Sequence, residues 1–110
     1  MNGRQAERLA ESLLLRNHLI LLERNYRSRF GEIDLIMQDG DTLVFVEVRQ
    51  RSNPHFGGAA ASIDGRKQRR LILTARRYLA KLKRMPQCRF DVVLFGDGPD
   101  PEWIRNAFDA

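Results

Sequence analysis

The spacing of apolar and polar residues changes several times along this chain, and two stretches follow the helical period. In the first stretch, which ends near Asn17, apolar residues recur three and four positions apart: Ala6, Leu9, Ala10, Leu13 and Leu14. In the second, from Ile63 to Arg84, the recurring residues are Leu71, Ile72, Ala75, Tyr78, Leu79 and Leu82. Pro86 forbids a longer helix. The pattern therefore predicts two amphipathic helices.

Shorter apolar runs have the length and composition of strands. These runs cover residues 19–23, 33–38, 42–49 and 90–95. Residues 52–62 are rich in glycine and alanine and contain Pro54, so we expect a loop there. The pattern does not decide whether residues 103–108 form a helix or a strand.

The two strands in the middle of the chain form a predicted hairpin. Asp39-Gly40-Asp41 connects them, and Asp-Gly is a strong hairpin signal. The first strand places Ile33, Leu35 and Met37 on one face. The second is apolar on the face of Val44, Val46 and Val48, which favours a covered position in the middle of a sheet.

Composition narrows the class of protein. A chain of 110 residues with 43% hydrophobic residues forms one domain, residues 1–110, with a core of its own. The single Cys88 cannot form an internal disulfide, and it makes no zinc-ligand pattern with His18 and His55. The leucine-rich runs on either side of Arg16 are too short to cross a membrane or to form a signal peptide. We therefore expect a soluble, cytoplasmic protein without a membrane partner.

Basic residues are concentrated in the second predicted helix. The chain has 19 Lys and Arg against 14 Asp and Glu, a net charge of +5, which favours a polyanionic partner such as nucleic acid. Between Arg66 and Arg84 there is no acidic residue, and nine residues are basic: Arg66, Lys67, Arg69, Arg70, Arg76, Arg77, Lys81, Lys83 and Arg84. A solvated helix usually mixes charges of both signs, so this composition favours phosphate contacts.

A second basic group precedes the predicted hairpin. Arg24, Arg27 and Arg29 alternate there with Tyr26 and Phe30. The group could contact nucleic acid or form salt bridges with the neighbouring glutamates, Glu23 and Glu32.

Two carboxylates interrupt the apolar strands of the hairpin. Asp34 lies in the first strand and Glu47 in the second, and carboxylates are rarely buried unless they are paired or bind a metal. A loop of Asp39-Gly40 sets Glu32 opposite Glu47 with Asp34 on the diagonal, whereas a loop of Gly40-Asp41 sets Asp34 directly opposite Glu47. Either loop places Asp34 and Glu47 on one face, while a three-residue loop without a bulge would separate them.

The energetic cost of such a pair suggests a ligand. Two bare carboxylates about 4 Å apart repel by roughly 4 kcal/mol at an effective dielectric constant near 20. A divalent cation would turn this cost into affinity. The alternative is that arginines cap Asp34 and Glu47, or that both face water at the edge of the sheet.

Polar residues of the two predicted helices border the same region. Glu7 lies at the edge of the first apolar stripe, and it either leans toward the sheet or remains a solvated flank charge. Lys67 and Gln68 lie on the buried side at the start of the second helix, where they need polar partners. A carboxylate or phosphate site would supply these partners; the alternative is a frayed first turn.

Several motifs together resemble one protein family. Most of the chain takes part in the resemblance, through Ala6-Glu7, Asn25-Tyr26-Arg27, Gly31-Glu32-Ile33-Asp34-Leu35-Ile36, the run from Leu43 to Arg51, Lys67, Arg70-Leu71, Ala75, Arg89-Phe90-Asp91-Val92-Val93 and Trp103-Ile104. In these motifs the chain resembles the YraN family of endonuclease-like bacterial proteins. That family is similar in its core to the PD-(D/E)XK nuclease superfamily and to archaeal Holliday junction resolvases.

The resemblance implies a fold and a set of metal ligands. The fold is a restriction-endonuclease-like α/β/α core, with a mixed central sheet of four to five strands flanked by helices. Glu7, Asp34 and Glu47 would bind Mg²⁺ or Mn²⁺, the Val48 carbonyl would add a ligand, and Arg49 would act on the phosphate.

This chain departs from the superfamily pattern at two positions. Ile33 stands in place of the proline of the motif, which supplies no ligand. Arg49 stands where lysine is usual, and a guanidinium stays protonated, so Arg49 can hold a phosphate but cannot act as a general base. Activation of water would then fall to the metal, with Lys67 as a helper.

We therefore expect a metal-dependent phosphodiesterase that acts on DNA, either branched or single-stranded. Asp34, Glu47, Arg49 and Lys67 would be its catalytic residues. The DNA backbone would contact the arginines Arg27, Arg29, Arg51, Arg66, Arg69, Arg70, Arg76 and Arg77. A resolvase-like role would favour a homodimer. The alternatives are a nuclease fold that binds nucleic acid without turnover, which Arg49 favours, and a protein-interaction module.

Overall fold

The computed structural model describes residues 1–50 and 63–110. The described part contains two helices and five strands: α1 (Gly3–Arg16), β1 (Ile20–Ser28), β2 (Gly31–Asp39), β3 (Thr42–Gln50), α2 (Gly65–Leu79), β4 (Gln87–Phe95) and β5 (Glu102–Phe108). The predicted loop at 52–62 and the predicted phosphate contact Arg51 lie outside the described residues. Neither helix of the described part has the length and apolar character needed to cross a membrane.

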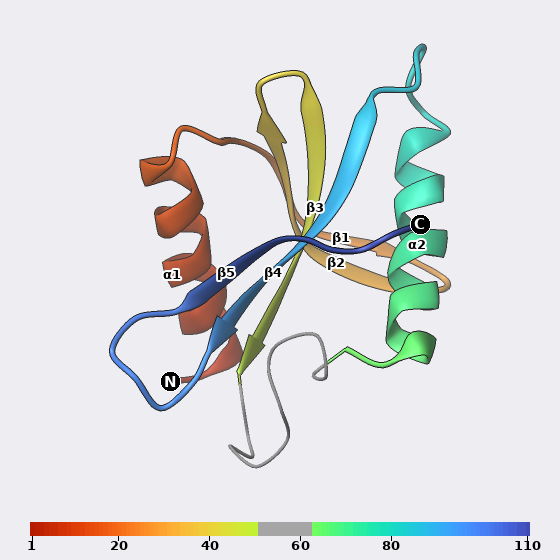
Figure 1. Ribbon diagram of the computed structural model, residues 1–110. Helices are drawn as coiled ribbons and strands as arrows, with labels where there is room; N and C mark the ends of the chain where they lie inside the picture. The colour runs from red at the N-terminus through yellow and green to blue at the C-terminus, as the bar shows by residue number, and fades with distance from the viewer. Residues whose placement is uncertain (51–62) are drawn as a thin grey trace.

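The five strands form one mixed sheet between the two helices. The strand order follows the chain, β1-β2-β3-β4-β5, and β3 and β4 are parallel whereas the other neighbours are antiparallel. Helix α1 covers one face of the sheet and α2 the other (Figure 1). This arrangement confirms the predicted α/β/α class with a mixed sheet flanked by helices, and it confirms β3 as the middle strand.

Each helix packs its apolar stripe on the sheet. On the α1 face, Ala6, Ala10 and Leu14 are buried with residues such as Leu35 and Val46. On the α2 face, the buried cluster contains Ile33, Ile36, Leu43, Phe45, Ile63, Leu71, Ala75, Phe90, Val92 and Leu94. Parallel strands need a crossover connection, and the connection from β3 to β4 contains α2.

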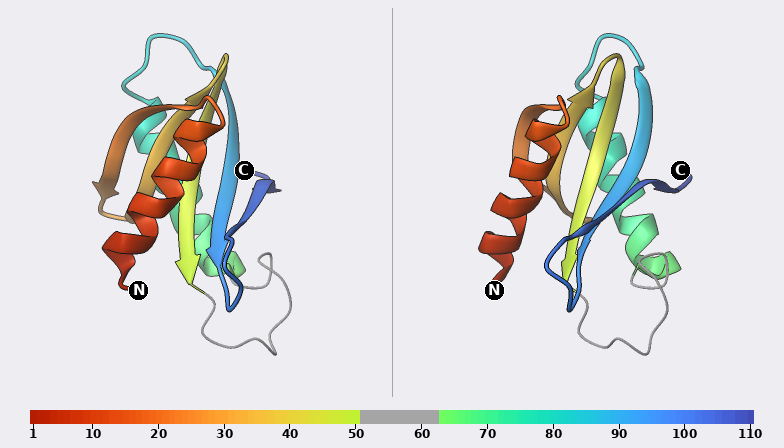
Figure 2. Two further views of the ribbon diagram at one scale, coloured as in Figure 1. Left: turned by 90° about the vertical axis from the view of Figure 1, so that its left-hand side faces the viewer. Right: turned by 60° about the vertical axis from the view of Figure 1, so that its left-hand side comes forward.

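The two helices begin at the same end of the molecule. In both views of Figure 2, the N-terminal ends of α1 and α2 lie at the end where the β3 arrow points. Residues near the carboxyl end of β3 therefore lie between the first turns of the two helices.

Two segment predictions were wrong, and one undecided segment is now assigned. Helix α2 ends at Leu79 and not at Arg84, because Leu82 is 40% exposed and does not continue the buried stripe. Strand β1 runs to Ser28, well beyond the predicted end at residue 23. The undecided segment at 103–108 is strand β5.

The alternation of side chains in β2 changes at Asp34. Leu35 and Met37 share the α1 face, as predicted, but Ile33 packs on the α2 face and does not share it. Opposite this point in β1, Asn25 has a left-handed backbone with φ of 51°. Local irregularities of this kind re-aim side chains and are common beside functional sites.

Candidate metal and phosphate site

The turn of the hairpin sets the register of β2 and β3. Asp39 pairs with Thr42 and Leu35 pairs with Val46, so the loop is Gly40-Asp41, the second of the two predicted registers. Gly40 has φ of 59°, a left-handed conformation that glycine adopts at little cost. Continued by one residue, this register sets Asp34 opposite Glu47.

Asp34 and Glu47 form a closely coupled pair. The Glu47 side chain is only 4% exposed, and Asp34 Oδ2 accepts a hydrogen bond of 2.8 Å from the Val48 N–H. Burial raises the pKa of Asp34 to about 9, helped by its hydrogen bond with Glu47 and by the Glu47 charge, while the Val48 N–H acts in the opposite direction. Asp34 therefore keeps its proton at neutral pH when no cation is present.

Lys67 provides the positive charge nearest to this pair. Its Nζ lies 3.0 Å from Glu47 Oε2. Lys67 stands in the first turn of α2, where its backbone N–H donates to Asp64 Oδ1 at 2.8 Å and fixes the start of the helix. The neighbouring Gln68 is also turned inward and donates to the Ile63 carbonyl at 3.1 Å. Both residues have the polar partners that their positions required.

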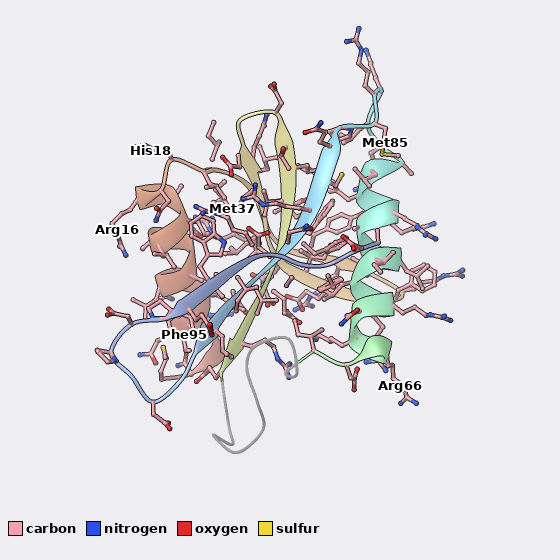
Figure 3. All side chains as sticks on the ribbon, viewed as in Figure 1. Arg16, His18, Met37, Arg66, Met85 and Phe95 are labelled. Carbon is pink, nitrogen blue, oxygen red and sulfur yellow. The ribbon has the colours of Figure 1, made fainter. Side chains whose placement is uncertain are left out.

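A small basic cavity lies beside the Lys67 side chain. Its volume is about 280 Å³, and its lining residues are Arg49, Asp64, Arg66, Lys67 and Arg70. Four of the five are cationic, and Arg66 projects from the lower end of α2 (Figure 3). The structure thus places Arg49 and Lys67 together at the edge of one polar cavity.

Glu7 lies at the periphery of the carboxylate pair. Its Oε1 accepts a hydrogen bond of 2.9 Å from Asn25 Nδ2, which also donates to Glu32 Oε1 at 2.7 Å. The charge of Glu7 contributes to the raised pKa of Asp34. Within residues 1–50 and 63–110, however, no three His, Cys, Asp or Glu side chains are grouped closely enough to hold a metal ion. The structure thus brings two of the three predicted carboxylates together.

Asn25 is a site residue whose contacts could not be derived from its position in the sequence. It holds Glu7 and Glu32 at once. The sequence indicated this role only weakly, because asparagine tolerates the left-handed backbone conformation that this position requires.

The donor groups fit a hard divalent cation. Carboxylate oxygens are the ligands that Mg²⁺ and Mn²⁺ prefer in proteins. Asp34 and Glu47 bring two such carboxyl groups together, with Lys67 Nζ 3.0 Å from Glu47. The Val48 carbonyl remains a predicted ligand.

The other predicted phosphate contacts lie on two surfaces. On α2, the arginines Arg66, Arg69, Arg70, Arg76 and Arg77 are all exposed, as predicted. Near β1, Arg27 pairs with Glu32 at 3.4 Å, and Arg29 lies over the Phe30 ring, 4.8 Å from its centroid. Arg24 pairs with Glu11 at 2.7 Å, so the predicted salt-bridge role of this group is present, in part with a different glutamate.

The fold and site define the class of the protein. It is a mixed α/β domain whose five-stranded mixed sheet, flanked by two helices, is compatible with a restriction-endonuclease-like core. Residues 6–95 match the uncharacterised protein family UPF0102, and the chain belongs to this family. This confirms the YraN assignment made from the motifs.

Relatives from several bacteria match nearly the whole chain. The UPF0102 protein of Nitrosospira multiformis is 59% identical over 100% of this chain and 94% of its own length. That of Nitrosomonas eutropha is 58% identical, with 97% of this chain and 92% of the relative covered. That of Cupriavidus taiwanensis is 59% identical over 98% of this chain and 82% of its own length.

Proposed function

We propose that this protein is a divalent-metal-dependent phosphodiesterase that cleaves DNA, branched or single-stranded. The observation that carries the proposal is the pair of Asp34 and the buried Glu47, with Lys67 Nζ 3.0 Å from Glu47 and an arginine-lined cavity beside Lys67. A carboxylate pair next to a cluster of cations can hold a metal ion and a phosphate side by side.

The residues divide the chemistry between them. Asp34, after losing its proton, and Glu47 would hold Mg²⁺ or Mn²⁺, with the Val48 carbonyl as a further ligand and Glu7 nearby. The bound cation would supply charge stabilisation and a water of lowered pKa. Arg49 stays protonated and can hold a phosphate through two parallel hydrogen bonds. Lys67, freed from Glu47, would contact the same phosphate.

The exposed arginines of α2 would position the DNA backbone. Phosphate contacts of this kind fix register and orientation but carry no sequence information. They would support binding to DNA of many sequences.

Asp34→Asn tests the proposal. We expect Mn²⁺-dependent cleavage of single-stranded and branched DNA by the unaltered protein and its loss in the variant, because an amide cannot balance a cation. Asp41→Asn, an exposed change in the same hairpin, is the matched control and should keep full activity. Products are separated on a denaturing gel, and Mn²⁺ binding is followed by calorimetry. Intact DNA across a broad panel of structures, with either metal, would show that cleavage is the wrong assignment.

Arg49 favours a second candidate, DNA binding without turnover. No general base replaces the usual lysine at this position, because arginine does not give up its proton. This candidate predicts salt-dependent DNA binding and Mn²⁺ binding without any product. The same cleavage assay, run beside an equilibrium binding assay, separates the two functions.

A further inference from the structure

A second polar cavity lies on the other side of the carboxylate pair, between α1 and β1. Its volume is about 550 Å³, and its lining residues are Arg4, Glu7, Arg8, Glu11, Ser12, Arg24, Asn25 and Leu35. The five that come from α1 recur at three- and four-residue spacing, so they form one stripe of the helix. This polar stripe lies beside the buried stripe of Ala6, Ala10 and Leu14.

Some charged side chains in this cavity form ion pairs or hydrogen bonds, and others do not form ion pairs with the described residues. Arg24 and Glu11 pair through two hydrogen bonds of 2.7 and 2.9 Å, and Glu7 accepts from Asn25. Arg4 and Arg8, in contrast, make no ion pair with any residue that the structure describes. Two guanidinium groups in the first half of α1 therefore remain available for an anion, close to the helix N-terminus, whose dipole also favours negative charge.

The cavity borders the candidate site at β2. Glu7, in the cavity lining, accepts a hydrogen bond from Asn25, which lies opposite Asp34 in the register of β1 and β2. Leu35, the residue after Asp34, is buried and forms part of the lining. The basic cavity at Arg49 and Lys67 lies at the start of α2, so the carboxylate pair has a cationic cavity on each side.

We propose that the cavity between α1 and β1 binds a nucleotide of the DNA strand that is cleaved, next to the scissile bond, with its phosphate on Arg4 and Arg8. This inference rests on the proposed function and adds a second contact point on the same strand. The volume exceeds what one phosphate needs, and the carboxylates and the Asn25 side-chain oxygen offer acceptors to a base or sugar.

The placement of the two cavities also selects the form of DNA. Helices α1 and α2 cover opposite faces of the sheet (Figure 2), and each cavity lies beside one of them, so one strand that occupies both cavities must curve around the sheet. Duplex DNA has a persistence length of about 150 base pairs and resists such a bend, whereas a single strand is flexible. The occupant is therefore a nucleotide of a single-stranded segment.

Replacing Arg8 tests this inference. Fluorescence anisotropy with a labelled single-stranded oligonucleotide in EDTA measures binding without cleavage. We expect Arg8→Gln to weaken binding about tenfold, the size of one charged hydrogen bond, and to lower the slope of log affinity against log salt by about 1. Arg16→Gln makes the same charge change on the same helix, at the opposite end of α1 (Figure 3), and should change affinity less than twofold.

A second variant separates occupation of the cavity from general electrostatics. Ser12→Phe fills the cavity without changing charge and should also weaken single-strand binding, whereas Ser12→Ala should not. Circular dichroism checks that each variant is folded.

The outcomes separate this inference from the proposed function. If Arg8→Gln and Arg16→Gln weaken binding equally, or Ser12→Phe has no effect, the cavity is not a nucleotide site, while the proposed function stands. If Arg8→Gln weakens blunt duplex binding as much as single-strand binding, the single-stranded assignment is wrong. If the unaltered protein neither binds DNA in EDTA nor cleaves it with Mn²⁺, both proposals fall.

Discussion

Asp34 holds its proton in the metal-free protein because burial and the neighbouring Glu47 both oppose its ionisation. The two carboxyl groups therefore carry one negative charge between them, which Lys67 balances at 3.0 Å. This is the reverse of an ordinary surface aspartate, which is charged at neutral pH and prefers water. The difference has a measurable effect on stability.

The stability of the metal-free protein should fall as pH rises from about 4 to about 9. The unfolded chain loses the Asp34 proton near pH 3.8, whereas the folded protein keeps it up to about pH 9. Because the pKa of Asp34 is higher in the folded protein than in the unfolded chain, protonated Asp34 contributes its full stabilisation below pH 3.8. This contribution to the free energy of unfolding is lost as the pH rises toward 9.

Asp34→Asn cannot ionise, so its melting temperature should depend less on pH. In EDTA, the melting temperature of the unaltered protein should fall relative to that of Asp34→Asn by about 5 °C or more between pH 5 and pH 8. A loss of 1 kcal/mol corresponds to roughly 4–8 °C in a domain of this size. Asp41→Asn should follow the unaltered protein. Parallel melting curves for Asp34→Asn and the unaltered protein would contradict the raised pKa.

Strand β5 is held to β4 by a buried carboxylate. Asp91 is fully buried and accepts hydrogen bonds from Arg89 Nε at 3.0 Å, Trp103 Nε1 at 3.0 Å and the Asn106 N–H at 2.9 Å. Arg89 also reaches Asp39 in β2, with 2.8 Å between Nη2 and Oδ2. One aspartate thus satisfies donors on two strands at the edge of the sheet.

Asp91→Ala should therefore destabilise the protein by about 3 kcal/mol, because its removal leaves the two donors on β5 without their acceptor. It also leaves Arg89 with Asp39 as its one remaining ion-pair partner among the described residues. Urea unfolding, followed by the fluorescence of the single Trp103, measures this cost. Asp97→Ala, an exposed change in the loop before β5, is the control and should stay within about 0.5 kcal/mol. A similar result for Asp91→Ala would show that other contacts hold β5.

Elements with a long or regular pattern could be predicted from the sequence, and those fixed by distant contacts could not. The alternation in β3 and the Asp-Gly turn indicated the hairpin, but turn composition alone allowed two registers. The half-buried segment at 103–108 has no clear period, because it forms an edge strand. The face of Ile33 depends on the backbone of Asn25 in the neighbouring strand, which no local pattern reports.

Parts of the candidate site could also be predicted from local patterns, whereas its contacts between distant elements could not. Asp34 and Glu47 were recognisable as a pair because carboxylates stand out in apolar strands, and their shared face follows from a two-residue loop. The contact of Lys67 with Glu47 was not derivable, because it depends on where the crossover from β3 places the start of α2. The hydrogen bond from Asn25 to Glu7 joins two elements, so it could not be derived either.

At the scale of the whole molecule, charge is distributed unevenly. The outer face of α2 is basic throughout, and α1 and α2 begin at the same end, on either side of the carboxylate pair. A net charge of +5 arranged in this way attracts a polyanion toward the outer face of α2. Binding to DNA should therefore depend steeply on salt.

Removing two charges from α2 tests this distribution. We expect the double variant Arg76→Gln, Arg77→Gln to weaken DNA binding about equally for different sequences and to reduce the salt slope by about 2, because each phosphate contact releases about one counterion. Lys83→Gln with Arg84→Gln removes the same charge beyond the end of α2 and should change the slope less. Anisotropy titrations across a salt series provide the slopes, and equal slopes for the two double variants would contradict a specific role of α2.

Lys67 gives the metal-free protein an internal counter-ion. Because its ammonium already balances Glu47, the fold does not need a metal to offset repulsion inside the hairpin. Folding can then be complete before any metal arrives. A divalent cation would replace the Lys67 ammonium beside Glu47 and the proton on Asp34. Its measured binding free energy would therefore be the gain from metal coordination minus the cost of displacing these two groups. Metal uptake would therefore release a proton and a lysine side chain together.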